Sequence, residues 1–398
     1  MKKKKILFIH PSMYIGGAER SLLSLLGNID PECYDISLFL YRHVGEFMPY
    51  IPSTVHLLPE NSCYGTFDVP IRSLLLSSRW KYGAARLLGK LLLHKMKRET
   101  KENLGVWASM QNISRSLLPL LPVIEGRYDV AIQYLGVPDV LLEKVNADKK
   151  IAWCHTDYTT LGPDCKYDLK IYHQIDNVVT VSEDCRKQLL QIYPSLYSKV
   201  KVVENMLSPD LITKLSKEPA YDLKNGESQF LLLSVGRYSE AKNFDNIPDI
   251  CRIIRESGLN VKWYIIGYGG DESLIRQKIR ESKMENWVIL LGKKVNPYPY
   301  MKACDLYVQP SRYEGKCVSV LEAQILHKPV VITNYATASN QLQNGVDGLI
   351  VPMENRECAE GIAALLRDPE RMTAFASATE VYDYSNYQEL VKFYELLE

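Results

Sequence analysis

The stretch FLLLSVGR at residues 230–237 decides the fold class of the second half of the chain. It opens with a mostly apolar run and closes with glycine and arginine, and a helix-length segment at 245–256 follows. Further apolar runs lie at 263–266, 288–291, 306–309, 330–333 and 349–351, with helix-length segments between several of them. Such alternation is typical of a parallel sheet whose strands are joined by crossover helices. The second half is therefore predicted to be α/β.

The first half repeats this alternation. Its apolar runs lie at 6–9, 36–40, 130–134, 151–153 and 178–181. A chain of 398 residues has room for two domains. We therefore expect two Rossmann-like domains facing a cleft, at 1–205 and 206–380, with a polar hinge that begins near 205. Residues 381–398 form a predicted C-terminal helix that packs back on the first domain, because its apolar side chains share one helix face: Tyr387, Leu390, Val391, Tyr394 and Leu397.

Composition excludes several classes of protein. Apolar residues make up 46% of the chain and the formal net charge is +1, which argues against a disordered chain and a globally basic nucleic-acid binder. The nine cysteines include no C-x-x-C pair, so we interpret them as reduced thiols. No apolar run reaches the length of a spanning helix, and the run after Lys5 is too short for a signal peptide. A cytoplasmic location is expected.

Two cations follow the strand predicted at 230–235. Arg237 comes directly after Gly236, and Lys242 precedes the next helix together with Asn243. The carboxyl ends of parallel strands are where α/β sheets bind ligands, and an arginine with a lysine can hold phosphate oxygens. We predict a diphosphate here; the alternative is a pair of solvated surface charges.

The segment PSRYEGKCVSVLEA at 310–323 is a second group of candidate residues. Glu314 and Gly315 lie in a loop before a helix that begins near Val318, whose free backbone N–H groups can meet hydroxyl or phosphate oxygens. Glu322 lies about one turn into that helix, and both carboxylates can accept hydroxyl groups from a ribose or hexose. Alternatively, Glu322 is an exposed helix residue and Glu314 a loop charge.

The first domain offers smaller signals. Gly16 and Gly17, between the first strand and helix, can let the backbone approach a ligand, or simply form a turn. His155, after the strand at 151–154, can donate to a sugar hydroxyl or be a structural histidine. The G-x-G-x-x-G and Walker lysine patterns are absent from this first turn, which argues against nicotinamide and P-loop sites. Without a D-x-D pair, no bound metal is expected.

Together these residues resemble the retaining glycosyltransferases of the GT-B fold, family 4, of the cell-envelope and capsular polysaccharide type. The resemblance implies that Arg237 and Lys242 clamp the donor diphosphate, that Glu322 holds the ribose, and that Glu314 lies against the transferred sugar. It also implies backbone contacts from Lys316 and Cys317 to sugar hydroxyls. The base-contacting loop would lie at 292–295 and include Lys294 and Val295. The sequence departs from the family at Lys316 and Cys317, where many members have an apolar residue followed by Gly or Pro.

The expected activity is transfer of a hexosyl or N-acetylhexosaminyl group from a nucleotide diphosphate sugar, with a UDP-sugar favoured. The acceptor would be a lipid-linked compound or a saccharide in surface polysaccharide synthesis. The resemblance implies retention of the anomeric configuration, no cofactor and no metal. A nucleotide-sugar epimerase of the same fold and a nucleotide-sugar-binding protein without turnover remain alternatives.

Residues 71–127 contain far more basic than acidic side chains. If 72–98 form one helix, the side chains of Arg72, Arg79, Arg86, Lys90 and Lys97 share a stripe. Such a basic amphipathic helix can lie on an anionic membrane surface, where each basic residue contributes about 1 kcal/mol. This would place the protein peripherally on the inner face of the cell membrane. Ordinary helices that pack their leucines on the domain are the alternative. Nucleic acid is not an expected partner, because this segment has few aromatic residues on which bases could stack.

Overall fold

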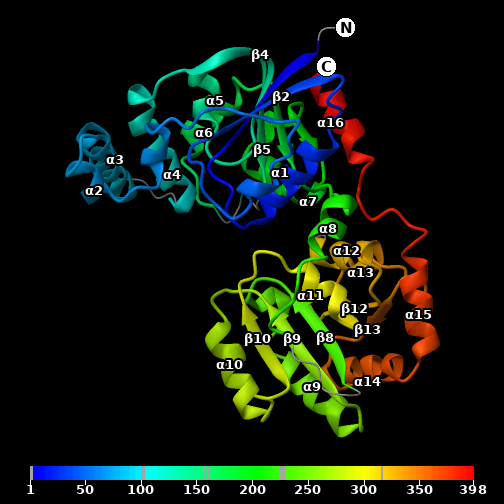
Figure 1. Cartoon of the computed structure of the whole chain (residues 1–398). Helices are drawn as coiled ribbons and strands as arrows, with labels where there is room; N and C mark the ends of the chain where they lie inside the picture. The colour runs from blue at the N-terminus through cyan, green and yellow to red at the C-terminus, as the bar shows by residue number, and fades with distance from the viewer. Residues whose placement is uncertain (1–2, 100–103, 156–157, 159–160, 224–228, 315–316) are drawn as a thin grey trace. The chain divides into compact units, whose positions relative to one another are not determined.

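The computed structural model describes residues 3–99, 104–155, 158, 161–223, 229–314 and 317–398 (Figure 1). The chain divides into two compact units. Unit 1 comprises Met1–Met206 together with Tyr387–Glu398, and unit 2 comprises Leu207–Asn386. Each unit contains its own parallel sheet, as the alternation of apolar runs and helix-length segments predicted.

Unit 1 contains a parallel sheet with the strand order β3-β2-β1-β4-β5-β6-β7. The strands are β1 (Lys4–His10), β2 (Tyr34–Leu40), β3 (His56–Leu57), β4 (Ile124–Gln133), β5 (Val145–Cys154), β6 (Asn177–Thr180) and β7 (Val200–Val202). In register, Ile9 pairs with Phe39 on one side and with Gln133 on the other. The buried runs at 6–9 and 130–132 are covered on both faces, which explains why they are continuously apolar.

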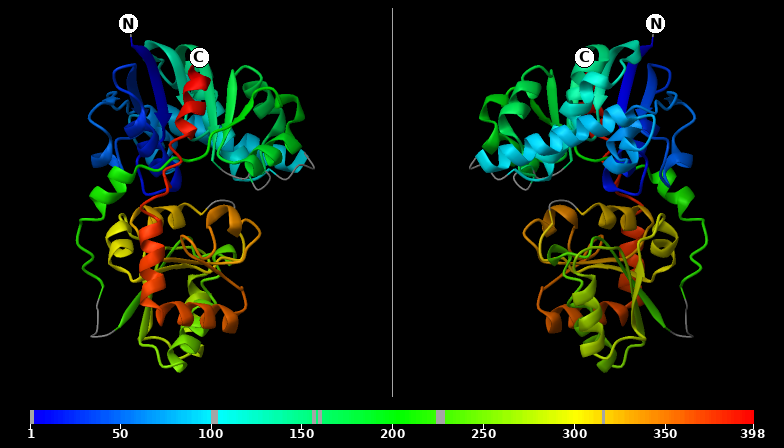
Figure 2. Two further views of the ribbon diagram at one scale, coloured as in Figure 1. Left: turned by 90° about the vertical axis from the view of Figure 1, so that its right-hand side faces the viewer. Right: turned by 90° about the vertical axis from the view of Figure 1, so that its left-hand side faces the viewer.

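The helices of unit 1 are α1 (Gly17–Asn28), α2 (Ile71–Leu75), α3 (Trp80–Glu99), α4 (Val106–Leu117), α5 (Asp139–Lys144), α6 (Cys165–Tyr172), α7 (Glu183–Ile192) and α16 (Glu389–Leu397). Figures 1 and 2 show α16 beside the strands of unit 1, close to the N-terminus. The ring of Phe393 stacks on Phe8 at 6.2 Å, and Tyr394 stacks on Tyr34 at 5.2 Å. The predicted return of the C-terminal helix to the first domain is confirmed.

The single basic helix predicted over 72–98 is wrong. Helix α2 ends at Leu75, and α3 begins only at Trp80. Ser77 Oγ accepts the backbone N–H of Arg79 at 3.1 Å in the turn between them. Arg86 also leaves the predicted stripe, because its guanidinium turns inward and donates to the carbonyls of Thr66, at 2.8 Å, and Val69. Among the described residues, no helix combines the length and apolar character needed to cross a membrane.

Unit 2 contains a parallel sheet with the strand order β10-β9-β8-β11-β12-β13. The strands are β8 (Phe230–Val235), β9 (Val261–Ile266), β10 (Val288–Gly292), β11 (Leu306–Gln309), β12 (Val330–Thr333) and β13 (Leu349–Val351). The helices are α8 (Pro209–Leu215), α9 (Ile247–Glu256), α10 (Glu272–Glu281), α11 (Tyr298–Ala303), α12 (Val318–Ile325), α13 (Ala338–Gln341), α14 (Asn355–Leu366) and α15 (Pro369–Ala378).

Each sheet has one point where the direction of chain progression reverses. In unit 2 the chain moves outward from β8 through β9 to β10, and then outward on the other side from β11 to β13. In unit 1 the same reversal lies between β1 and β4. Ligands of open α/β sheets bind outside the carboxyl ends of the strands at such switch points. In unit 2, the loops after β8 and β11 are therefore the expected site-forming segments. In unit 1, they are the loops after β1 and β4.

Candidate functional site

The switch point of unit 2 brings together the two groups of residues that the sequence nominated. Gly236 and Arg237 follow β8, and the loop Pro310–Glu314 follows the neighbouring strand β11. Because β8 and β11 are parallel, both segments leave the sheet at the same edge. Residues about 75 positions apart in sequence thus share one site; Lys242 and Cys317 approach within 3.8 Å.

Lys242 and Glu314 form an ion pair in this site. Lys242 ends a short 3₁₀ turn, Glu240–Lys242, and its Nζ lies 2.5 Å from Glu314 Oε1. Burial works to lower the pKa of Lys242, but the interactions with Cys317 and Glu314 outweigh it, so this pKa lies above its usual range. Burial raises the pKa of the Cys317 thiol, which is therefore neutral near pH 7, and we assign the main stabilisation of the ammonium to Glu314. The site holds a charged lysine.

Two neighbours shape the position of the lysine. A Cβ atom on Gly236 would lie 3.2 Å from Lys242 Cε and from Phe244 Cζ, so the glycine leaves room for the lysine stem. Arg237 is exposed, and within the described residues no hydrogen bond or ion pair engages its guanidinium. The two cations predicted to clamp a diphosphate therefore differ: one is already paired, and the other is open to solvent.

The loop that carries Glu314 is tied to the segment that carries Lys242. Arg312 makes two bonds to the Asp245 carboxylate, at 2.8 and 3.0 Å, and its backbone N–H donates to Ala241 at 2.8 Å. Ser311 Oγ donates to Glu314 Oε1 at 2.5 Å. Such two-pronged arginine pairs restrict geometry as well as adding attraction. The Glu314 carboxylate is thus held in place from both sides of the site.

The start of α12 carries the residues to which the family resemblance assigned backbone contacts with the sugar. Gly315 and Lys316 lie outside the described residues. The Cys317 backbone N–H, which was expected to contact a sugar hydroxyl, already donates to Gln341 Oε1 at 2.7 Å. Val318 is the first residue of the helix, as predicted. The contact of the Cys317 N–H with a sugar hydroxyl therefore stays a prediction, in which the hydroxyl would replace the side chain of Gln341, a residue that the sequence did not indicate.

Glu322 is buried inside unit 2 rather than exposed on α12. Its exposed fraction is 0%, and its Oε1 accepts the hydroxyl of Tyr298 at 2.8 Å. A buried carboxylate needs such partners, because removing its charge from water is costly. The alternative that Glu322 is an ordinary surface residue is thus excluded. Tyr298 was not nominated by the sequence; its role as a partner of Glu322 depends on packing of α11 on α12.

The predicted base-contacting loop follows β10. Gly292 has a φ of +68°, in the left-handed region that favours glycine. Lys294 Nζ pairs with the Asp222 carboxylate, and this hydrogen bond raises the pKa of Lys294. Val295 is 37% exposed. The loop therefore presents an apolar side chain next to a paired lysine.

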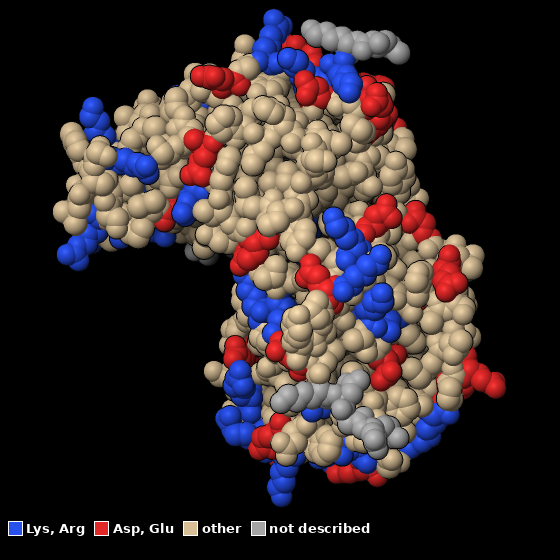
Figure 3. All heavy atoms as spheres, viewed as in Figure 1, with Lys and Arg blue, Asp and Glu red and all other residues tan. Residues whose placement is uncertain are grey.

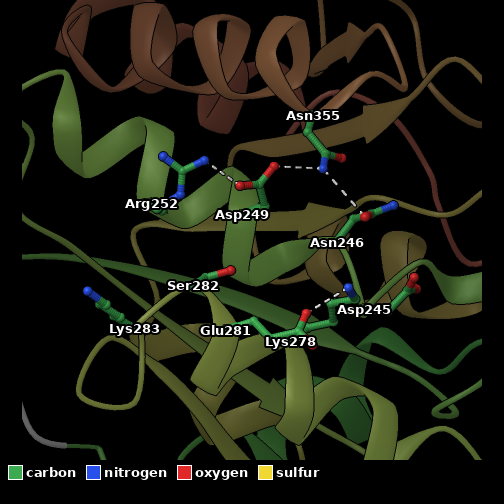
Figure 4. A pocket seen from close by; sticks show the side chains of 9 residues that line it. All are labelled: Asp245, Asn246, Asp249, Arg252, Lys278, Glu281, Ser282, Lys283 and Asn355. Atoms are coloured by element: carbon green, nitrogen blue, oxygen red, sulfur yellow. Dashed lines mark hydrogen bonds and ion pairs between the residues drawn. The ribbon is translucent and has the colours of Figure 1, made fainter.

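A separate polar hollow of about 590 Å³ lies beside the start of α9. Figure 4 shows its nine lining residues: Asp245, Asn246, Asp249, Arg252, Lys278, Glu281, Ser282, Lys283 and Asn355. Asp249 pairs with Arg252 at 2.5 Å, and Lys278 with Glu281 at 2.8 Å. Its three acidic and three basic side chains cancel in formal charge. This balance gives the hollow no attraction for a diphosphate comparable to that of Arg237 and Lys242.

In unit 1, the two predicted glycines stand at the start of α1. Gly16 is the N-cap residue and Gly17 the first helical residue. A Cβ atom on Gly17 would meet nothing within 4 Å, so the space beside it is open. On Gly16 a Cβ atom would meet only the flexible Glu19 carboxylate, at 2.1 Å. The structure thus leaves the helix start accessible but does not require glycine for its backbone.

His155 lies just beyond β5 and contacts the backbone after β4. Its Nε2 lies 2.9 Å from the carbonyl oxygen of Tyr134, so we assign the ring proton to Nε2. Burial, with a smaller effect from His10, lowers the pKa of His155 to about 3, so the ring is neutral at physiological pH. The remaining nitrogen, Nδ1, is then an acceptor. The expectation that the ring donates to a sugar hydroxyl is corrected: this histidine can accept from one.

His10, at the end of β1, is a second buried histidine that the sequence analysis did not single out. Its Nδ1 donates to the Ser12 carbonyl at 2.7 Å, and burial lowers its pKa to about 4. Both His10 and His155 lie against the ring of Tyr134, at centroid distances of 6.3 and 4.6 Å. Within the described residues, no group of three or more His, Cys, Asp or Glu side chains is placed to hold a metal ion.

Comparisons with known proteins identify the type of domain. Residues 220–381 match the family model described as glycosyl transferases group 1. An uncharacterized glycosyltransferase of Methanocaldococcus jannaschii is 26% identical over 52% of this chain and 54% of its own length. The poly(ribitol-phosphate) α-N-acetylglucosaminyltransferase of Staphylococcus aureus is 23% identical over 53% of this chain and 41% of its own length. The chain thus spans about half the length of the curated relatives it matches.

Solved structures extend the likeness to the whole fold. Anabaena HepE in complex with UDP and glucose has a TM-score of 0.61 at 18% identity and covers 98% of this chain and 99% of that one. S. aureus TarM has a TM-score of 0.62 at 15% identity, with 99% and 100% covered. Unit 2 therefore matches the glycosyl transferases group 1 model over most of its length, and the chain has the fold of the GT-B glycosyltransferases.

Proposed function

We propose that this protein is a retaining glycosyltransferase that moves a sugar from a nucleotide diphosphate donor to a lipid-linked or saccharide acceptor. The observation that carries the proposal is the position of Arg237, Lys242 and Glu314 around one switch point, on a domain of the glycosyl transferases group 1 family. Two cations suit a diphosphate, and a carboxylate suits the hydroxyl groups of the sugar beside it.

In this mechanism the protein stabilises the leaving group electrostatically. Arg237 and Lys242 bind the diphosphate, and the start of α12 at Val318 adds the positive end of a helix. Glu314 binds hydroxyl groups of the transferred sugar. In unit 1, the acceptor nitrogen of His155 can accept a hydrogen bond from a hydroxyl group. Following the family resemblance, we assign the buried Glu322, held by Tyr298, to the ribose end of the donor and Val295 to the base. In unit 1, the space beside Gly17 at the start of α1 is open.

We favour a UDP-sugar as donor. Support comes from the HepE structures, which contain UDP or UDP-glucose, and from the TarM complex, which contains UDP. For the acceptor, support comes from a Campylobacter jejuni relative whose name describes transfer of N-acetylgalactosamine to a diphospho-undecaprenol-linked sugar. That relative is 25% identical over 52% of this chain and 54% of its own length. A lipid-linked acceptor suits our further proposal of peripheral attachment to the inner membrane face.

The decisive assay offers the protein a panel of nucleotide sugars, with and without saccharides or membrane lipid extract. A transferase consumes donor and labels an acceptor with the anomeric configuration retained, which NMR of the product reports. Release of a modified nucleotide sugar without any acceptor would identify an epimerase instead. Binding without turnover under every condition would leave only a nucleotide-sugar-binding protein. Glu314→Gln should abolish transfer, whereas Glu240→Gln, an exposed neighbour of the site, should not.

We also propose that turnover requires no metal. The chain contains no D-x-D pair to anchor a metal-bound diphosphate, and Arg237 with Lys242 supplies the positive charge instead. Transfer should therefore proceed at an unchanged rate in EDTA. Loss of turnover that magnesium or manganese restores would contradict this part of the proposal.

A further inference from the structure

Helices α2 and α3, with the turn after α2, carry large apolar side chains that are substantially exposed. Their exposed fractions range from 39% to 80%: Leu75 39%, Leu76 80%, Trp80 54%, Leu87 42%, Leu88 58%, Leu91 60% and Leu92 46%. At about 100° per residue, the five members on α3 fall within about 140° of the helix circumference. We call these seven side chains the leucine face.

The leucine face is exposed because two glycines, Gly83 and Gly89, lie on the parts of α3 that pack against α2 and α4. A Cβ atom on Gly83 would lie 2.9 Å from the backbone nitrogen of Leu75, so α2 packs tightly there. A Cβ atom on Gly89 would lie 2.1 Å from Ser116 Oγ, which marks the contact with α4. Leucine side chains are thus not needed to attach α3 to its own domain. The alternative that ordinary helices pack their leucines on the domain holds for Leu74, which is 1% exposed, but not for the leucine face.

The same surface is strongly positive. Residues 71–98 include no aspartate or glutamate. Its exposed basic side chains are Arg72, Arg79, Lys81, Lys90, Lys95, Lys97 and Arg98. In Figure 3 the part of the surface formed by α2 and α3 shows blue and tan atoms. Exposed leucines and tryptophan interleaved with long basic side chains are the pattern of a helix that lies in a membrane interface.

We propose that the leucine face docks on an anionic lipid bilayer, with Leu88 and Leu91 entering the apolar layer and the flanking lysines contacting headgroup phosphates. A second copy of the chain fits less well. A symmetric dimer places the same patch on both sides, so cations would oppose cations with no carboxylate from 71–98 between them. An anionic bilayer satisfies both the apolar and the charged components.

This inference replaces the basic stripe as the membrane-binding element. The stripe included Arg86, whose guanidinium is used inside unit 1. The docking rests on the proposed attachment to the inner membrane face, but it does not depend on donor chemistry. The two proposals can therefore fail separately.

The test uses the full chain and vesicle flotation. Vesicles containing phosphatidylglycerol should bind the wild type at low salt, and binding should weaken as salt shortens the screening length. Leu88→Gln combined with Leu91→Gln should lower the partition coefficient at least tenfold. The matched control, Tyr221→Gln with Val381→Gln, changes two exposed residues of unit 2 that are 86% and 82% exposed, and it should bind like the wild type. Lys90→Gln with Lys97→Gln should reduce binding to anionic vesicles only.

Three results would overturn the docking proposal. The wild type could ignore anionic vesicles at low salt, or the leucine variant could bind them as the wild type does. In the third, sedimentation without vesicles would show a wild-type dimer that the leucine variant loses. UDP affinity, measured on the same samples, should be equal in all variants. Normal vesicle binding by a protein that binds no nucleotide would refute the transferase proposal and leave the docking intact.

Discussion

Lys242 and Glu314 join two loops that follow different strands of unit 2. The pair is largely but not fully shielded from water, with side chains 18% and 11% exposed. An arriving diphosphate would therefore compete with Glu314 for the ammonium, while the exposed Arg237 is available at once. Single residues at this site thus have separable effects on nucleotide binding.

Arg237→Ala should weaken binding of UDP by roughly 10- to 150-fold, because charge-assisted hydrogen bonds contribute about 1.5–3 kcal/mol. The fold should be unaffected, since the side chain is exposed. Titration calorimetry with UDP measures the change. Arg276→Ala is the control, because Arg276 pairs with Glu272 on the surface of α10. Equal affinity in the Arg237 variant and the wild type would remove this residue from the donor site.

His10→Gln should make unit 1 less sensitive to acid. Burial lowers the pKa of His10 to about 4, so between pH 7 and 5 the unfolded chain gains a proton that the folded chain does not. This costs the wild type about 2 kcal/mol of unfolding free energy at pH 5 relative to pH 7. The His10→Gln variant should therefore lose about 2 kcal/mol less unfolding free energy than the wild type between pH 7 and pH 5. Urea unfolding of both proteins at the two pH values measures this difference.

The comparison isolates His10 because other buried groups are common to both proteins. Asp139 and Asp168 act in the opposite direction: burial raises each pKa to about 6, so protonation below that pH favours the folded state. Their contribution cancels in the difference between variant and wild type. An identical loss of stability in both proteins would mean that His10 is not held neutral by the fold.

At the scale of elements, α16 completes the core of unit 1 with a segment from the far end of the chain. Phe393 is fully buried, and its ring lies 6.2 Å from Phe8 and 6.3 Å from Trp153. The helix therefore contributes to the same layer of side chains as β1 and β5. Unit 1 depends on residues that the chain reaches only after unit 2.

Phe393→Ala should destabilise unit 1 by about 3–5 kcal/mol, because it leaves a cavity among large side chains. Val391→Ala, on the exposed side of the same helix and 60% exposed, should change stability by less than about 0.5 kcal/mol. Denaturant unfolding, monitored by hydrogen exchange of the β1 and β5 amides, distinguishes the Phe393 variant from the Val391 variant. Similar stability of both variants would show that α16 is not part of the core.

The whole molecule consists of two units with separate sheets and separate clusters of buried side chains. Both strongly predicted phosphate ligands, Arg237 and Lys242, belong to unit 2. A nucleoside diphosphate should therefore stabilise unit 2 without a comparable effect on unit 1.

At UDP concentrations near 100 times the dissociation constant, unit 2 should gain about 2.7 kcal/mol. Hydrogen exchange should slow in the strands of unit 2, especially β8 and β11, and remain unchanged in β4 and β5 of unit 1. Protection confined to unit 1 would place the nucleotide on the wrong unit and contradict the proposed donor site.

The sequence by itself determined the two α/β series and the strand ends that carry Arg237, Lys242, Glu314 and His155. Those features are local: apolar periodicity and the residue that follows a strand depend on neighbours a few positions away. In a parallel sheet, the residues after neighbouring strands share one edge, so local pattern was enough to bring Arg237 and Glu314 of unit 2 to the same edge.

Only the tertiary structure decided which polar groups and which surfaces remain available. The side chain of Gln341 accepts a hydrogen bond from the Cys317 backbone N–H, and the Tyr298 hydroxyl donates to the buried Glu322. The Tyr134 carbonyl accepts the ring proton of His155, which leaves the other ring nitrogen as an acceptor. Each depends on a partner that is more than 20 residues away in sequence and is brought into contact by packing. The leucine face has the same origin, because close helix contacts at Gly83 and Gly89 turn those leucines toward solvent. Hydrogen bonding and burial depend on which groups, distant in sequence, come into contact in the fold. Apolar periodicity along the chain does not specify those contacts.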